Sequence, residues 1–226
     1  MGRAMYLRID GSQYRQILVA GDIHGCYQLL HQQLQAYQFD PEQDLLLSVG
    51  DIIDRGPQSL SCLVLLEAPW FRMALGNHEQ MAFTALLSGM EQHWQRNGGD
   101  WFSRLRGEAR LRAERLLRRC EQLPLVMEVT HLPQRVVIAH ADYPAAHYRY
   151  EQPVDAEALV WSRDRVSRAL EGEGERIGGA DLFLFGHTPL KRPLKFLNQL
   201  YLDTGAVFGG RLTLLRIKRP EPLPSR

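Results

Sequence analysis

The chain has 226 residues, of which 45% are hydrophobic and 23% are charged. These proportions are typical of soluble globular proteins and exclude a disordered chain. The 27 basic residues nearly balance the 26 acidic ones, so the net charge is only +1. A protein that binds nucleic acid through its overall charge is therefore excluded. No internal repeat and no long linker divides the sequence, so we predict a single domain over residues 1–226.

The cysteines and the apolar runs predict the cellular location. Cys26, Cys62 and Cys120 are odd in number and lack the CxxC spacing. They indicate reduced thiols in a cytoplasmic compartment rather than a disulfide framework. Residues 1–13 lack the apolar run of a signal peptide, and no stretch approaches the ~18 apolar residues of a membrane span. We expect a cytoplasmic protein with no membrane partner.

Short apolar runs and helical patterns alternate in the first half of the chain. The apolar runs are rich in Ile, Leu and Val and end at a glycine, which is typical of buried strands. This alternation predicts parallel strands with helices packed on the sheet. In chain order, we expect a strand at 16–20, a helix at 26–37, a strand at 44–49, a helix at 58–67, a strand at 71–75 and a helix at 78–87.

The middle and the second half of the chain follow a different pattern. Two glycines at 98–99 interrupt the chain, and residues 104–120 then carry seven arginines with leucines among them. This pattern predicts an amphipathic helix with a solvated basic face, and docking of acidic partners is the alternative interpretation. Apolar runs predict further strands at 125–129, 135–139, 182–185, 200–202 and 211–217.

Six polar side chains each come shortly after a predicted strand. They are Asp22, His24, Asp51, Asn77, His140 and His187. Binding sites of open α/β sheets form outside the carboxyl ends of the strands, so we expect these side chains to lie together. Carboxylate, amide and imidazole groups suit a divalent first-row transition metal. The pattern therefore predicts a metal site at one end of the fold.

The motifs around these residues resemble those of a known family. In chain order they read GDIHG at 21–25, GDIIDRG at 50–56, GNHE at 76–79, HAD at 140–142 and GHT at 186–188. This ordered set is similar to that of the phosphoprotein phosphatase family of metallophosphoesterases. The HADYP form and DTGA at 203–206 are most similar to its bacterial and phage serine/threonine phosphatases, in particular the enterobacterial protein phosphatase 1 type. The resemblance implies an α/β, calcineurin-like four-layer sandwich of two mixed β-sheets flanked by helices.

The resemblance also implies a centre of two divalent metal ions. Manganese is the expected metal, with iron or zinc as alternatives. A hydroxide bound to both ions would attack the phosphorus, so no protein nucleophile is required. By their positions in the motifs, the implied ligands are Asp22 and His24 for the first metal, Asp51 as the bridge, and Asn77, His140 and His187 for the second metal.

Other motif residues match the catalytic and substrate-binding groups of the family. His78 matches the general acid that protonates the leaving alkoxide, and Asp54 matches the carboxylate that orients it. Arg55 and Arg163 match the arginines that bind the phosphoryl oxygens. Asn77 and His78 are also expected to contact the substrate.

The resemblance predicts a serine/threonine protein phosphatase that acts on phosphoproteins, and it leaves activity on phosphotyrosine open. A dinucleoside polyphosphate hydrolase of the diadenosine tetraphosphatase kind is the nearest alternative, because that branch shares the GDxHG-type start. A metal-dependent nuclease is disfavoured by the nearly neutral charge. A metal-bound scaffold without activity is disfavoured by His78, Asp54 and Arg55, since a binding module needs no acid dyad. The oligomeric state is not predicted.

Overall fold

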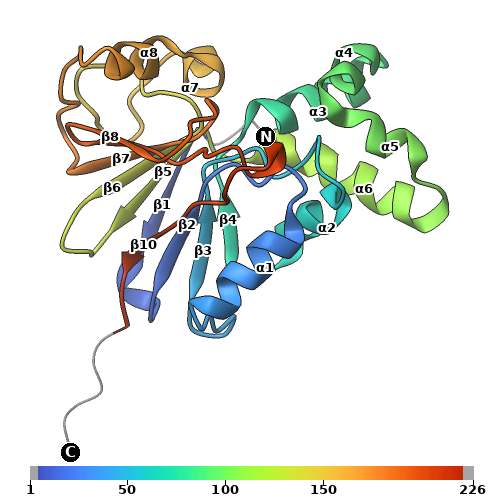
Figure 1. Cartoon of the computed structure of the whole chain (residues 1–226), viewed down its shortest axis with the longest axis horizontal. Helices are drawn as coiled ribbons and strands as arrows, with labels where there is room; N and C mark the ends of the chain where they lie inside the picture. The colour runs from blue at the N-terminus through green and yellow to red at the C-terminus, as the bar shows by residue number, and fades with distance from the viewer. Residues whose placement is uncertain (1–4, 221–226) are drawn as a thin grey trace, which may run out of the picture.

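Two β-sheets pack face to face in the computed structural model, which describes residues 5–220 (Figure 1). The N-terminal segment in which we expected no signal peptide falls partly outside the described residues. Among residues 5–220, no helix combines the length and apolar character needed to cross a membrane. All three cysteines are free thiols.

Both sheets are mixed. The six-stranded sheet has the order β1-β5-β6-β7-β9-β8, and the four-stranded sheet has the order β10-β2-β3-β4. Strands β2, β3 and β4 run parallel to one another, as the alternation of strands and helices predicted. The strands are β1 (Tyr6–Asp10), β2 (Ile17–Ala20), β3 (Leu45–Ser48), β4 (Phe71–Met73), β5 (Val126–Thr130), β6 (Val136–Ala139), β7 (Leu182–Phe185), β8 (Leu194–Phe196), β9 (Gln199–Tyr201) and β10 (Leu214–Lys218).

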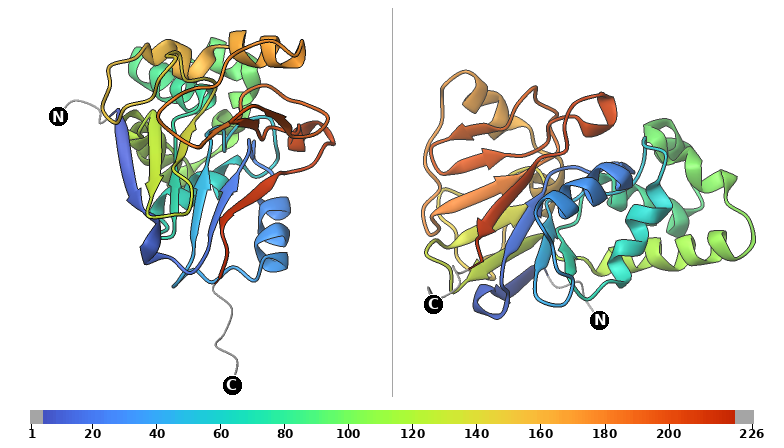
Figure 2. Two further views of the ribbon diagram at one scale, coloured as in Figure 1. Left: turned by 90° about the vertical axis from the view of Figure 1, so that its left-hand side faces the viewer. Right: turned by 60° about the horizontal axis from the view of Figure 1, so that its bottom comes forward.

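Helices cover the outer faces of the two sheets. Helices α7 and α8 lie over the six-stranded sheet, whereas α1 and α2 lie beside the four-stranded sheet, and α3 to α6 form a helical group at one side (Figures 1 and 2). The helices are α1 (Tyr27–Ala36), α2 (Ser59–Val64), α3 (Asn77–Ser88), α4 (Gln92–Trp94), α5 (Asp100–Arg104), α6 (Gly107–Arg119), α7 (Ala156–Trp161) and α8 (Asp164–Leu170). A π-helical segment, η3 (Gln95–Gly99), joins α4 to α5.

The central strands are apolar on both faces because both faces are buried. Successive side chains of a strand point to opposite sides of the sheet. In β2, Ile17 and Val19 belong to the core between the two sheets, whereas Leu18 and Ala20 belong to the core that includes the helices. Because the side chains on both sides of the sheet are buried, these strands are nearly continuous apolar runs in the sequence.

The predicted fold class is confirmed, and each predicted strand and helix has a counterpart. Strand β1 was not predicted, because this edge strand is only half-buried and carries Arg8 and Asp10. Helices α7 and α8 were also missed, since they have only six and seven residues, fewer than the ~10 residues over which periodicity identifies a helix. The single-domain boundary stays a prediction.

Candidate metal centre and active site

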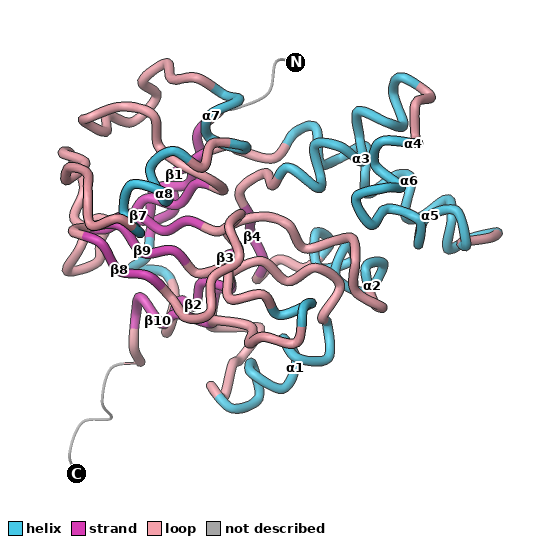
Figure 3. The backbone as a smooth tube through the Cα atoms, turned by 45° about the horizontal axis from the view of Figure 1, so that its top comes forward, coloured by secondary structure: helices cyan, strands magenta, loops and turns pink. Residues whose placement is uncertain are grey.

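The loops that follow the parallel strands meet at one end of the two sheets (Figure 3). Asp22 and His24 follow β2, Asp51 follows β3, and Asn77 begins α3 just after β4. From the other sheet, His140 follows β6 and His187 follows β7. All six side chains are buried. The structure thus brings the sequence-predicted ligands of both halves of the chain together.

Two clusters of metal-binding groups share Asp51. His24, Asp51 and His78 form one cluster, and Asp51, His140 and His187 form the other, with the ligand atoms of each cluster within 4.8 Å of one another. Oδ2 of Asp51 lies 3.7 Å from Nε2 of His24 and 3.4 Å from Nε2 of His140. The Asp51 carboxylate is therefore placed between two candidate metal positions.

Main-chain carbonyls set the orientation of two of the imidazoles. Nδ1 of His24 lies 2.8 Å from the carbonyl oxygen of Ile53, and Nδ1 of His140 lies 3.0 Å from that of Val49. A carbonyl oxygen only accepts hydrogen bonds, so each Nδ1 carries a proton and donates it. In the neutral ring, Nε2 then presents a lone pair toward Asp51, which is the metal-binding form.

Asn77 adds an amide oxygen to the second cluster. Its Oδ1 lies 2.9 Å from Nε2 of His140 and 3.0 Å from Nδ1 of His187. Burial and the neighbouring His140 lower the pKa of His187 to about 3, so this ring is neutral. The amide oxygen and the imidazole nitrogens converge on a small volume that a cation fits well.

Asp22 lies beside this arrangement and accepts hydrogen bonds from the main-chain N–H of His187 at 3.0 and 3.2 Å. A side chain at position 186 would collide with the Asp22 carboxylate, so the glycine before His187 permits this close approach. Asp22 does not belong to either of the two clusters that share Asp51. Its role as a ligand stays a prediction.

Several buried carboxyl groups lie in this region, which is unfavourable without positive charge; they are those of Asp22, Asp51, Asp54, Glu79 and Asp203. Burial, Asp203 and Asp51 raise the pKa of Asp22 well above its usual value. Burial and Asp51 likewise raise the pKa of Glu79 to about 7. Buried charges are stable only when they are paired or bind metal. Two divalent cations would supply that charge, so the donor set fits the metal centre that the motifs imply.

The backbone of the site is strained in the same loops. Nine non-glycine residues of the described chain have positive φ angles, and five of them belong to the predicted site. Left-handed φ angles cost about 1–3 kcal/mol each at such positions and persist only where the surroundings impose them. The five residues are His24 (φ 43°), Asp51 (φ 52°), Asp54 (φ 73°), Arg55 (φ 65°) and His187 (φ 67°).

Glu79 holds the loop that carries Asp51, a role that the sequence did not reveal. Its carboxylate accepts hydrogen bonds from the main-chain N–H groups of Asp51 and Ile52, each at 2.9 Å, and of Ile53 at 3.3 Å. Three donors on one carboxylate fix the loop after β3. The position of Glu79 in the GNHE motif was the available signal, but no partner could be assigned to it.

His78 and Asp54 form a buried pair beside the first cluster. Nδ1 of His78 donates to Oδ2 of Asp54 at 2.7 Å, and Nε2 of His78 lies 4.0 Å from Asp51. The carboxylates of Asp51 and Asp54 raise the pKa of His78 and outweigh the opposing effect of burial. Nε2 therefore faces the centre and is suited to carry a proton.

Two tryptophans, which the sequence did not identify as site residues, donate hydrogen bonds to the carboxylate of this pair. The indole N–H of Trp94 donates to Oδ2 of Asp54 at 2.8 Å, and that of Trp101 donates to Oδ1 at 2.7 Å. They come from α4 and α5, on either side of the π-helical segment η3. Within that segment, the carbonyl of Gly98 accepts the main-chain N–H of Arg55 at 3.1 Å. The segment from Trp94 to Trp101 therefore contacts two neighbouring residues of the predicted site.

Each of the two predicted phosphate-binding arginines lies near a different cluster. Nη1 of Arg55 lies 2.7 Å from Nε2 of His24, and its guanidinium lies 5.4 Å from the ring centre of the exposed Phe208. The positive charge of Arg163 helps to lower the pKa of His187, which places this exposed arginine near the second cluster. Both side chains are exposed, and their role in binding phosphate stays a prediction.

Comparison with known proteins places the chain in a family. Residues 15–197 match the calcineurin-like phosphoesterase family, so the chain belongs to this family. Serine/threonine-protein phosphatase 1 of Salmonella typhimurium is 50% identical to the chain, covering 95% of the chain and 97% of the relative. Serine/threonine-protein phosphatase 2 of Escherichia coli is 44% identical and covers 96% and 100%. The predicted family is confirmed.

More distant proteins share the fold. The bis(5'-nucleosyl)-tetraphosphatase PrpE of Bacillus cereus is 27% identical over 90% of the chain and 91% of its own length. A crystal structure provisionally assigned as a diadenosine tetraphosphatase superposes with a TM-score of 0.65 at 22% identity, covering 94% of this chain and 93% of that one. This last likeness supports the fold alone.

Proposed function

We propose that the chain is a metal-dependent protein phosphatase that hydrolyses phosphoserine and phosphothreonine in proteins. The observation that carries the proposal is the pair of ligand clusters joined at Asp51, with the His78–Asp54 pair beside them. The names of the relatives that share 44–50% identity with the chain favour a phosphoprotein substrate. We further propose a single domain that works in the cytoplasm, which the three free thiols favour.

We assign the metal ligands as the motifs implied them. Asp22, His24 and Asp51 would hold one divalent ion, and Asp51, Asn77, His140 and His187 would hold the other. Manganese is the proposed metal, with iron or zinc as alternatives, because availability rather than the donor set selects among first-row metals at a mixed nitrogen and oxygen site. When bound, the two ions would polarise the phosphoryl group and supply an activated water.

His78 is proposed to protonate the leaving group. An alkoxide of serine or threonine is a poor leaving group, so a positioned acid accelerates its departure. Asp54 holds Nδ1 of His78 and thereby directs Nε2 toward the substrate oxygen. The two indole N–H groups orient the Asp54 carboxylate and oppose the effect of burial, which raises the pKa of Asp54, since hydrogen bonds to a carboxylate favour the charged form.

Arg55 and Arg163 are proposed to bind the phosphoryl oxygens. A guanidinium offers two parallel N–H donors that match two oxygens of a phosphate. Both side chains are exposed, so a substrate phosphate can reach them. Phe208, which lies over the Arg55 guanidinium, would limit the directions that Arg55 can take.

Dinucleoside polyphosphate hydrolysis is the alternative function, favoured by the name of the 27% identical relative. The deciding experiment offers a phosphoserine peptide, p-nitrophenyl phosphate and diadenosine tetraphosphate to the purified protein, with and without Mn²⁺. We expect Mn²⁺-dependent turnover of the peptide at a higher kcat/KM than that of the dinucleotide. Faster hydrolysis of the dinucleotide would overturn the proposal, and activity in the presence of a chelator would refute the metal requirement.

A further inference from the structure

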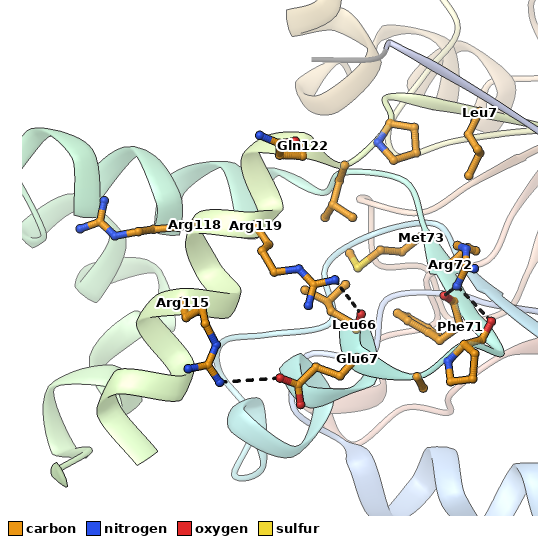
Figure 4. Close-up of a pocket in the computed structure, with 14 residues that line it drawn as sticks. Leu7, Leu66, Glu67, Phe71, Arg72, Met73, Arg115, Arg118, Arg119 and Gln122 are labelled. Atoms are coloured by element: carbon orange, nitrogen blue, oxygen red, sulfur yellow. Dashed lines mark hydrogen bonds and ion pairs between the residues drawn. The ribbon is translucent and has the colours of Figure 1, made fainter. Parts of the chain in front are cut away.

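A groove of about 690 Å³ lies outside the candidate active site, along strand β4 (Figure 4). It is bounded by β4, by the last turns of α6 and by the segment that precedes β5. The buried side chains of Phe71 and Met73 and the half-buried Leu66 form its apolar part. None of the predicted metal ligands or catalytic residues lines it.

Both sheets end at this groove. Strand β4 is the edge of the four-stranded sheet, and β1, which contributes Leu7 to the groove, is the edge of the six-stranded sheet. Along β4, the main chain of alternate residues faces β3, as the hydrogen bond from Leu46 N–H to the carbonyl of Trp70 shows. In a parallel ladder the intervening residues, including Met73, present their main-chain groups to the open side. Phe71 already donates its N–H to the carbonyl of Ala68 and accepts a hydrogen bond from Arg72, and Leu75 donates to the carbonyl of Pro124, so an extended chain along this edge is held by side-chain contacts rather than by strand pairing.

The charge of the groove is strongly positive. Four arginines line it, but only one carboxylate, that of Glu67. Glu67 is already shared, because it pairs with Arg112 and lies 3.9 Å from Arg115. Arg118 points away from the groove and pairs with Glu114 at 2.9 Å (Figure 4).

Arg72 and Arg119 form no ion pair within residues 5–220. Arg72 donates only to the carbonyls of Pro69 and Phe71, at 3.1 and 2.6 Å, and Arg119 donates to the carbonyl of Leu66 at 3.3 Å. These two arginines come from different elements, β4 and α6, and line the same groove. A solvated face of α6 accounts for Arg119 but not for Arg72. Charges that converge from two elements on an apolar floor indicate a binding surface rather than a solubilising one.

We propose that this groove binds an extended acidic segment of the phosphoprotein substrate, apart from the phosphorylated residue. The segment would alternate aspartate or glutamate with apolar residues. Its carboxylates would pair with Arg72, Arg115 and Arg119, and its apolar side chains would contact the half-buried Leu7 and Leu66. That the segment belongs to a substrate rests on the proposed phosphatase function. Binding of the acidic segment to the groove does not depend on that function.

The lining favours an acidic peptide over a nucleic acid. A single-stranded nucleic acid needs exposed aromatic side chains for base stacking, and Phe71, the aromatic residue of the groove, is only 2% exposed. The arginines are also separated along the groove, since Arg115 and Arg119 are one helical turn apart, about 6 Å along the α6 axis. Several spaced carboxylates match this spacing better than one compact anion does.

A direct binding experiment tests the site without relying on catalysis. The probe is a fluorescein-labelled octapeptide of alternating aspartate and valine, which carries no phosphate, and its anisotropy is measured against the full-length protein at low and high salt. We expect saturable binding that weakens as salt increases. In the double variant Arg72→Glu/Arg119→Glu, the affinity should fall about tenfold or more, and in Arg72→Lys/Arg119→Lys it should largely return.

A matched control distinguishes binding at the groove from an effect of the net charge of the protein. Arg168→Glu/Arg176→Glu makes the same change of net charge at two exposed arginines elsewhere, one of them also in the last turn of a helix. This variant should bind the octapeptide as the wild type does. Equal binding by both Glu variants, no saturable binding to the wild type, or tighter binding of a single-stranded oligonucleotide would overturn the proposal.

A kinetic experiment tests whether the groove serves the substrate. A phosphoserine peptide is compared with the same peptide joined to the acidic octapeptide through about 20 glycine and serine residues, which span roughly 25 Å on average. We expect KM to be about tenfold lower for the joined peptide, with kcat unchanged, and the difference to vanish in Arg72→Glu/Arg119→Glu. Octapeptide binding without this KM difference would overturn the substrate assignment, whereas loss of all turnover with intact binding would count against the phosphatase function.

Discussion

The hydrogen bond from Trp101 to Asp54 offers a measurement of how much the orientation of the acid contributes to catalysis. Trp101→Phe removes the N–H that lies 2.7 Å from Oδ1 of Asp54 but keeps an aromatic ring. A hydrogen bond to a charged group contributes about 1.5–3 kcal/mol, which corresponds to about 10- to 150-fold in rate. Because Asp54 retains the donors from His78 and Trp94, we expect the lower end, about a tenfold loss of kcat on a phosphoserine peptide.

The leaving group makes the assay specific. p-Nitrophenolate departs without a proton, so the same variant should lose less than about threefold with p-nitrophenyl phosphate. Trp70→Phe is the matched control, since Trp70 is also half-buried but packs edge-on against Phe39, with ring centres 5.4 Å apart. Its kcat should stay near that of the wild type on both substrates. Equal losses on the two substrates in Trp101→Phe, or an equal loss in Trp70→Phe, would refute the reasoning.

Four further outcomes follow from the contacts. His78→Asn should lose about 10²- to 10⁴-fold in kcat on a phosphoserine peptide yet retain metal, measured by mass spectrometry; loss of metal would make His78 a ligand. Asp51→Asn should lose both metals and turnover together, and near-normal turnover would refute the assignment of Asp51 as the ligand shared by the two metals. Arg55→Ala should lose about 10- to 150-fold in kcat/KM, and inorganic phosphate should inhibit this variant less strongly. An unchanged inhibition constant for phosphate would show that Arg55 does not bind phosphate. Burial alone would raise the pKa of Asp44, but hydrogen bonds from Arg15 and others hold that pKa below its usual value. This carboxylate therefore stabilises the fold above pH ~4, and the stability is lost as pH falls further. In urea unfolding, Asp44→Asn should be less stable than the wild type at pH 7, and the gap should shrink between about pH 5 and 3; a constant gap would contradict this.

The strands and the ligand positions were readable from the sequence because local patterns encode them. The buried strand β2 is apolar at every position and β3 at all but its last, and each ends before a motif that carries Asp22 or Asp51. The parallel order of β2, β3 and β4 then requires these loops to lie at one end. In the second half of the chain His140 and His187 also follow predicted strands, and the resemblance then implied which metal each of them would bind.

The supporting contacts depended on pairings far apart in the chain. Glu79 lies 28 residues from Asp51, whose main-chain N–H it accepts, and Trp101 lies 47 residues from Asp54. A tryptophan in a helical segment reads as core packing, because nothing in its neighbourhood indicates where its N–H will point. Only the packing of α4 and α5 against the loop after β3 decides that.

The basic helix α6 likewise has features that the sequence determines and others that only the tertiary structure decides. Its amphipathic pattern was sufficient to predict a solvated face of arginines along 104–120. The tertiary structure decided that Arg119 faces a groove whose other side carries Arg72 from β4. Periodicity reports which face of an element is polar, because that depends on local spacing. Which charges from different elements converge depends on how the sheets and helices pack, and this information lies in the long-range contacts of the folded chain.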